Sequence, residues 1–200
     1  MIFIAHRRNT IDELKRTSKK YGVEIDLRSS DNSIIVHHDP MAKGEKFSNW
    51  LDHYNHKFLI LNVKEEGLEK QIIDFLQKYK IDDYFFLDQS IPFLLKFSNF
   101  CNKKSAARVS EFESIETALK LKKYADWVWL DQFNSFPITP DEFESLKSSK
   151  YKICLVSPGL QGRFDDYEIM EMSKFLKKNN LKLDAICSKK CEFWESLLND

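Results

Sequence analysis

Short apolar runs alternate with amphipathic helical patterns along the whole chain. The apolar runs predict strands at 2–7, 23–28, 58–64, 83–88, 105–110, 126–131, 152–157 and 184–188. Helical patterns follow them near 11–21, 47–55, 66–79, 91–99, 114–123, 140–149, 165–179 and 191–198. Strands that are apolar throughout are typical of parallel sheets covered by helices. The pattern therefore predicts eight successive βα units.

Eight βα units in one chain predict an α/β fold of the closed (β/α)8 class, the TIM barrel. About 25 residues per unit is short for this fold, so the barrel is expected to be compact. Of the 200 residues, 42% are hydrophobic, which is enough for one full core. We therefore expect a single domain that spans residues 1–200.

One predicted element lies outside the βα alternation. The turn-forming residues Asp31-Asn32-Ser33 separate the second strand from a short apolar run at 34–39. The segment from Arg28 to His38 is therefore expected to form a hairpin-like excursion at the carboxyl end of the second strand.

Polar side chains collect where the predicted strands end, which is where the active sites of TIM barrels lie. These residues are His6, Arg7, Glu24, Asp26, Asn62, Lys64, Asp88, Arg108, Ser110, Asp131 and Ser157. The general polarity of loops explains part of this set. It explains less well why Glu24, Asn62 and Arg108 lie inside otherwise apolar strands, so the pattern indicates a functional pocket.

Glu24 and Asp26 are two residues apart on one strand, so their side chains point to the same face. If that face lines the barrel, two carboxylates there are unfavourable unless a cation compensates them. Their oxygens suit Mg²⁺ or Ca²⁺. The alternative is that Arg7, Arg28 or Lys64 pairs with them.

Three short segments of the sequence resemble the motifs of the glycerophosphodiester phosphodiesterase family. Members open with a strand ending in His-Arg, continue with Glu-x-Asp and then present His-Asp; here these are His6-Arg7, Glu24-Ile25-Asp26 and His38-Asp39. The resemblance covers about the first 65 residues. It implies a TIM barrel that hydrolyses small phosphodiesters with the help of a divalent cation.

The resemblance also implies residue roles. His6 and His38 correspond to the two histidines that act as general acid and base on either side of the phosphorus, for which imidazole is suited by its pKa near working pH. His37 competes with His38 for this role, and the family's His-Asp dipeptide favours His38.

Arg7 and Lys64 are the expected phosphate-binding residues, because arginine can bind two phosphate oxygens at once and lysine supplies a compact charge. Glu24 and Asp26 are the expected metal ligands, with Asn62 as a third. The family has Glu-x-Lys where this chain has Asn62-Val63-Lys64. An amide oxygen can bind Mg²⁺ or Ca²⁺ but brings no charge, so the expected affinity is weaker.

The chain departs from the family elsewhere as well. Arg8 stands where the family has glycine, the loop that follows is reduced to Asn9-Thr10, and the last strand ends in Ser188-Lys189 instead of Thr-Asp. Two further hypotheses therefore remain: a binding barrel that has lost metal and turnover, and a lyase that stops at a cyclic phosphate.

Composition limits the partners. The formal net charge is zero and no long basic run occurs, so nucleic acid is not an expected partner. The four cysteines are expected to be reduced thiols, and neither a signal peptide nor an apolar run of membrane-spanning length is apparent, so a cytoplasmic protein is expected. The alcohols that flank the phosphate, the roles of Arg8 and of the 157–163 loop, and the oligomeric state stay open.

Overall fold

The computed structural model describes residues 1–163 and 166–198, and they form the predicted (β/α)8 barrel. The barrel strands are β1 (Ile2–Ala5), β2 (Gly22–Ser30), β5 (Leu59–Val63), β6 (Tyr84–Leu87), β7 (Ala106–Val109), β8 (Trp127–Leu130), β9 (Lys152–Val156) and β10 (Ala185–Ser188). Parallel pairing runs from β1 through β2 and β5 to β6, and from β7 through β8, β9 and β10 back to β1. Between β6 and β7, both fully described, one isolated bridge joins Phe86 to Ser105. The barrel is therefore connected most weakly at this β6–β7 seam.

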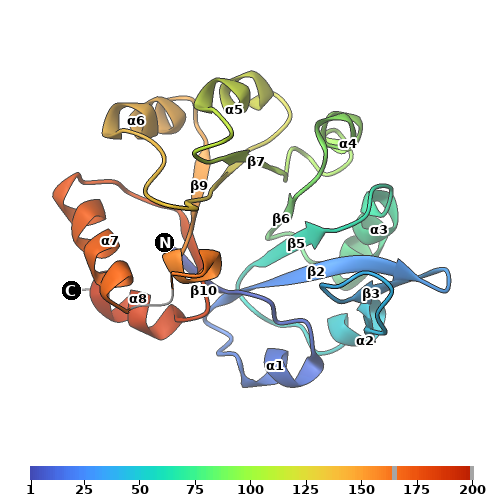
Figure 1. Cartoon of the computed structure of the whole chain (residues 1–200). Helices are drawn as coiled ribbons and strands as arrows, with labels where there is room; N and C mark the ends of the chain where they lie inside the picture. Colours follow the sequence, from blue (N-terminus) through green and yellow to red (C-terminus); the bar gives the residue numbers. More distant parts are fainter. Residues whose placement is uncertain (164–165, 199–200) are drawn as a thin grey trace.

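In residues 1–163 and 166–198, eight helices surround the strands (Figure 1). They are α1 (Ile11–Arg16), α2 (Phe47–Leu51), α3 (Glu69–Tyr79), α4 (Ile91–Phe97), α5 (Ile115–Leu121), α6 (Pro140–Ser148), α7 (Asp166–Lys178) and α8 (Cys191–Leu198). A 3₁₀ turn, η1 (Pro158–Gln161), follows β9. No helix in the described ranges is long and apolar enough to cross a membrane.

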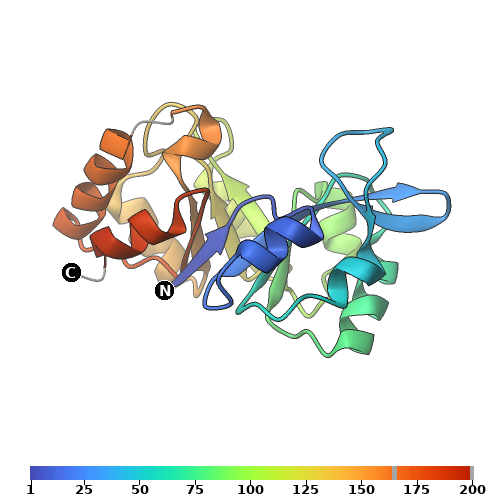
Figure 2. The ribbon, with the colours of Figure 1, turned by 90° about the horizontal axis from the view of Figure 1, so that it is seen from below.

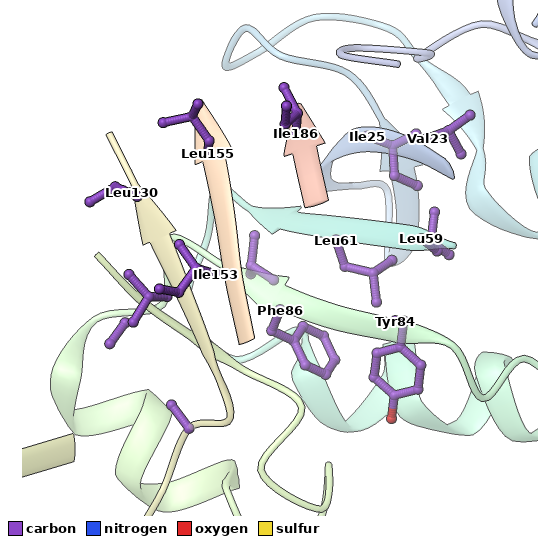
Figure 3. Close-up of a cluster of buried hydrophobic side chains, with 14 of the residues drawn as sticks. Val23, Ile25, Leu59, Leu61, Tyr84, Phe86, Leu130, Ile153, Leu155 and Ile186 are labelled. Carbon is purple, nitrogen blue, oxygen red and sulfur yellow. The ribbon is translucent and has the colours of Figure 1, made fainter. Parts of the chain in front are cut away.

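The alternation of side chains along the strands divides the core into two layers. One set, which includes Val23, Ile25, Leu59 and Leu61, packs between the strands and the helices (Figure 3). The other set fills the inside of the barrel, where the rings of Phe85 and Trp127 lie 4.8 Å apart. The residues that alternate with the outer set therefore point into the barrel. Glu24, Asp26 and Asn62 belong to this inward set.

The predicted excursion is a two-stranded hairpin. β2 continues beyond the barrel and pairs antiparallel with β3 (Ser33–Val36), which in turn pairs with the short β4 (Glu45–Lys46). Asp31 and Asn32 both have positive φ angles, 47° and 58°, as a two-residue hairpin turn requires. The tip of the hairpin extends beyond the helices in both views (Figures 1 and 2).

The strand predictions hold to within one or two residues, but several helices are shorter than predicted. α1 ends at Arg16 instead of residue 21, because residues 18–21 form the turn that leads into β2. α3 begins at Glu69 instead of residue 66, because Gly67 has a φ of 96°, which is outside the helical region. The predicted first residue of the seventh helix, 165, lies outside the described residues.

The four cysteines are buried and unbridged, as expected for reduced thiols.

Candidate active site

Glu24 is a deeply buried carboxylate at the barrel mouth, with an exposed fraction of 1%. One oxygen, Oε2, accepts the backbone N–H of Arg7 at 2.8 Å, and the other, Oε1, accepts the amide of Asn62 at 3.1 Å. His6 Nε2 lies 3.7 Å from Oε2. Burial raises the pKa of Glu24, and the neighbouring Asp26 raises it further. Glu24 thus holds a charge that the protein alone does not fully compensate.

Asp26, fully buried two residues further along β2, is better compensated. Its Oδ2 accepts the Asn9 amide at 2.8 Å and lies 3.6 Å from Arg7 Nε, while Lys64 Nζ lies 3.3 Å from Oδ1. Of the three cations expected to compete for the carboxylates, Arg7 and Lys64 do so. The third, Arg28, instead pairs with Glu65 at 3.4 Å. Ion pairs with Arg7 and Lys64 therefore account for the buried charge of Asp26 without a metal ion.

Three buried atoms at this end of the barrel have no hydrogen-bond partner among the described residues. They are Asp26 Oδ1, Asn62 Oδ1 and His6 Nδ1. Asp26 and Asn62 face each other in the register of β2 and β5. A buried acceptor without a donor costs about 1–3 kcal/mol, so Asn62 Oδ1 is open to a cationic ligand, whereas Asp26 Oδ1 already has Lys64 Nζ at 3.3 Å.

The donor set fits a hard cation, with one negative charge fewer than three carboxylates would give. Glu24, Asp26 and Asn62 offer oxygen ligands, which Mg²⁺ and Ca²⁺ prefer. No group of three or more His, Cys, Asp or Glu side chains suited to a metal occurs in the described part of the chain. The Lys64 ammonium also lies next to the Asp26 oxygen that a metal would use. The residues therefore support at most a weakly held metal ion.

His6 projects into the barrel from the end of β1, and its side chain is 13% exposed. Burial, together with the positive charges of Arg7 and Lys189, lowers its pKa to about 3. The imidazole is therefore neutral near pH 7 and can accept a proton. Arg7, the next residue, has a φ of 50°, and this unusual backbone conformation directs its N–H at Glu24.

His38 lies at the same mouth but on the hairpin side, half-exposed at 39%. Its Nδ1 is 2.8 Å from Asp39 Oδ1, and its carbonyl accepts Arg28 Nε at 2.8 Å. The His37 N–H donates to the Asp26 carbonyl at 3.0 Å, which ties the end of the hairpin to the site. A cavity of about 640 Å³ is lined by His37 and His38 together with Arg7 and Asn9.

The sequence did not assign roles to four residues that contribute to the site. Asn9 holds Asp26 from both sides, since its Oδ1 also accepts the Asp26 N–H at 3.0 Å. The Arg108 guanidinium pairs with Asp88 and Asp131, and Lys64 Nζ lies 3.4 Å from Asp88. The sequence indicates the Arg108 network, because an arginine lies within an otherwise apolar strand. It does not indicate the role of Asn9, which lies in a short polar loop.

In two segments whose roles the sequence left open, side chains donate hydrogen bonds to residues other than Glu24 and Asp26. Arg8 turns outward and donates to Thr17 Oγ1 and to the His6 carbonyl, both at 2.9 Å. Within the 157–163 loop, Gln161 donates to Asp131, and Arg163 donates to the carbonyls of Gln132 and Asn134. Both segments therefore fix loop geometry.

Comparison with solved structures identifies the fold. A glycerophosphodiester phosphodiesterase from Agrobacterium tumefaciens superimposes with a TM-score of 0.70 and 12% identity, covering 100% of this chain and 99% of that one. The chain has the fold of the glycerophosphodiester phosphodiesterases. A candidate member of that family from Galdieria sulphuraria gives a TM-score of 0.74 and 14% identity, covering 100% of this chain and 98% of that chain.

More distant barrels match less well. The tryptophan synthase α-subunit of Pyrococcus furiosus gives a TM-score of 0.53 and 11% identity over 99% of this chain and 94% of that chain. No family model matches the sequence, and the curated proteins contain no match. The likeness to the phosphodiesterases therefore lies in the fold.

Proposed function

We propose that the protein is a phosphodiesterase that hydrolyses small phosphodiesters at the mouth of its barrel. The observation that carries this proposal is the grouping of Glu24, Asp26 and Asn62 oxygens beside a neutral His6, with Arg7 and Lys64 within 4 Å of Asp26. The shared fold of the glycerophosphodiester phosphodiesterases supports the same conclusion.

Arg7 and Lys64 would bind the phosphate and stabilise the negative charge that develops on its oxygens. Glu24, Asp26 and Asn62 would hold Mg²⁺ or Ca²⁺, which when bound supplies further positive charge to the phosphate. The binding energy of these groups would orient the substrate for in-line attack.

The two histidines would move the protons. A neighbouring hydroxyl of the substrate forms the new bond to phosphorus and gives its proton to one imidazole, as the bond to the leaving alcohol breaks and the other imidazole protonates that alcohol. Water then opens the cyclic phosphate by the reverse transfers. His6, whose Nε2 lies 3.7 Å from Glu24 Oε2, is neutral at working pH, as the acceptor of the first proton has to be.

A second function, phosphate-ligand binding without turnover, is favoured by one observation. Asp26 already has Arg7 and Lys64 as partners, and Asn62 brings no charge to the metal ligands. In that case the pocket would bind glycerol phosphate and leave phosphodiesters intact.

The test is release of alcohol from a panel of glycerophosphodiesters with Mg²⁺ or Ca²⁺, followed by phosphorus NMR. His38→Ala should lower turnover by about 10²–10⁴-fold, and His37→Ala is the matched neighbouring control with a minor effect. A cyclic phosphate as the final product identifies a lyase. Binding of glycerol phosphate without turnover of any diester identifies the binding barrel, and inactivity of His37→Ala alone transfers the catalytic role to His37.

A further inference from the structure

A second cavity, of about 680 Å³, opens at the β6–β7 seam and reaches the candidate site. Lys64, Asp88 and Arg108 line it on the side of the barrel mouth. Cavities of about 300–1,000 Å³ hold ligands much larger than glycerol. The cavity is continuous with the proposed phosphate-binding Lys64, so a group attached to the phosphate can extend into it.

Part of the wall of this seam cavity is apolar. Leu87 of β6, Leu94 of α4, Ala107 of β7 and Leu121 of α5 line it where the barrel strands separate. Water that fills such a space is displaced favourably by hydrocarbon, at about 25 cal/mol per Å² of apolar surface. The walls therefore favour an apolar occupant.

Two large apolar side chains also stand at the edge of the seam cavity. Phe112 is 77% exposed, Ile91 is 49% exposed, and both line the cavity. The Phe112 ring packs against the half-exposed ring of Phe133 at 5.6 Å. Exposed apolar groups gathered at a cavity mouth mark a binding surface.

The two cations that line the seam cavity, Lys64 and Arg108, already have carboxylate partners. Lys64 lies between Asp26 and Asp88, and Arg108 between Asp88 and Asp131, with Glu113 Oε2 3.8 Å from Arg108 Nε. A charged ligand group would have to break one of these pairs and would lose hydration as well. An uncharged group avoids both costs.

We propose that the seam cavity binds a hydrocarbon chain on one of the two alcohol groups of the substrate. The substrate class is then a single-chain amphiphilic phosphodiester, with its phosphate between Arg7 and Lys64 and its chain between α4 and α5. This inference rests on the proposed function, because it places the phosphate where that function requires it.

Binding of alkyl phosphates tests the cavity without requiring turnover. Methyl, butyl, hexyl and octyl phosphate are titrated into the protein by calorimetry, with Mg²⁺ present and below the concentration at which the esters aggregate. Affinity should rise by up to about fourfold for each added methylene, which corresponds to about 0.8 kcal/mol for a fully buried CH₂.

Thr117 and Lys120 provide matched variants on α5. Both are exposed, and only Thr117 lines the seam cavity. Thr117→Trp should fill the cavity and remove the dependence on chain length, whereas Lys120→Trp, with the same new side chain one turn later, should keep it.

Equal affinities along the alkyl series, or an unchanged series in Thr117→Trp, would overturn the inference. Hydrolysis of glycerophosphodiesters by the same preparations reports on the proposed function separately. Chain-dependent binding that Thr117→Trp abolishes, together with no hydrolysis, would overturn the phosphodiesterase function and retain the hydrocarbon cavity.

Discussion

Buried carboxylates have different partners in the two halves of the barrel mouth. On the β6–β8 half, Asp131 accepts hydrogen bonds from Arg108, Gln161 and the backbone of Gln132, so both of its oxygens are satisfied. On the β1–β5 half, Asp26 Oδ1 accepts no hydrogen bond among the described residues and has only the Lys64 ammonium beside it, at 3.3 Å. The first arrangement stabilises the structure, and the second leaves an acceptor for a ligand. The contrast supports the proposal that the β1–β5 half carries the chemistry and the other half the framework.

The largest expected effect is that of a variant on the β1–β5 half that loses activity but keeps its stability. His6→Ala should lower phosphodiester turnover by about 10²–10⁴-fold, because it removes a proton acceptor within 4 Å of Glu24. The melting temperature should change little, since the described residues provide no hydrogen-bond partner for Nδ1. Activity assays and thermal melting of the same samples check this, with His53→Ala as the control. Full activity of His6→Ala would remove it from the mechanism.

The opposite result is expected on the β6–β8 half. Arg108→Met should destabilise the protein by about 3–5 kcal/mol, because it leaves the buried Asp131 and its neighbour Asp88 without their shared cation. Urea unfolding measures the loss. The double variant Arg108→Met/Asp131→Leu should recover part of it, since the buried charge is then absent. A single variant as stable as the parent would contradict the framework role of this half.

Much of the fold was predictable because it follows from local patterns. Each barrel strand is an apolar run, and the hairpin turn at Asp31-Asn32 has the residue types that its positive φ angles require. Helix ends were less predictable, since the conformation of Gly67 depends on how the chain leaves β5. The order of the helices and strands can thus be predicted from local sequence, whereas their ends depend on tertiary packing.

The candidate site was predictable in composition but not in pairing. The alternation of β2 placed Glu24 and Asp26 on one face, yet the competition among Arg7, Arg28 and Lys64 was settled only by the position of each strand. Asn9 could not be found in advance, because its contact with Asp26 crosses from the loop after β1 to β2. The seam cavity likewise depends on the separation of β6 and β7, which no local pattern encodes.

A gain of metal affinity would test whether the β1–β5 half provides metal ligands. Asn62→Glu should bind Mg²⁺ or Ca²⁺ at least about tenfold more tightly than the parent, or about 1.4 kcal/mol, because it adds a charged ligand opposite Asp26. Calorimetric titration of both proteins measures the difference. Asn134→Glu, in an exposed loop, is the control for added charge. Equal affinities would show that position 62 does not face the metal.

The smallest expected effect concerns Glu111, which holds the two loops at the edge of the seam cavity together. Its carboxylate accepts the backbone N–H groups of Phe133, Asn134 and Ser135 at 2.7–3.0 Å. Burial alone would raise its pKa, but these three donors outweigh burial and lower the pKa to about 2.

Because the folded pKa lies below the ordinary value of 4.5, the contribution of Glu111 to stability is fully present above about pH 4.5 and declines as the pH falls toward 2. Glu111→Gln should therefore be about 1 kcal/mol less stable than the parent at pH 7, and the difference should shrink at pH 3. Urea unfolding of both proteins at the two pH values isolates this residue from the other carboxylates, which are common to both. A difference that is constant with pH would mean that the loops are held by packing of Phe112 on Phe133 and not by the carboxylate.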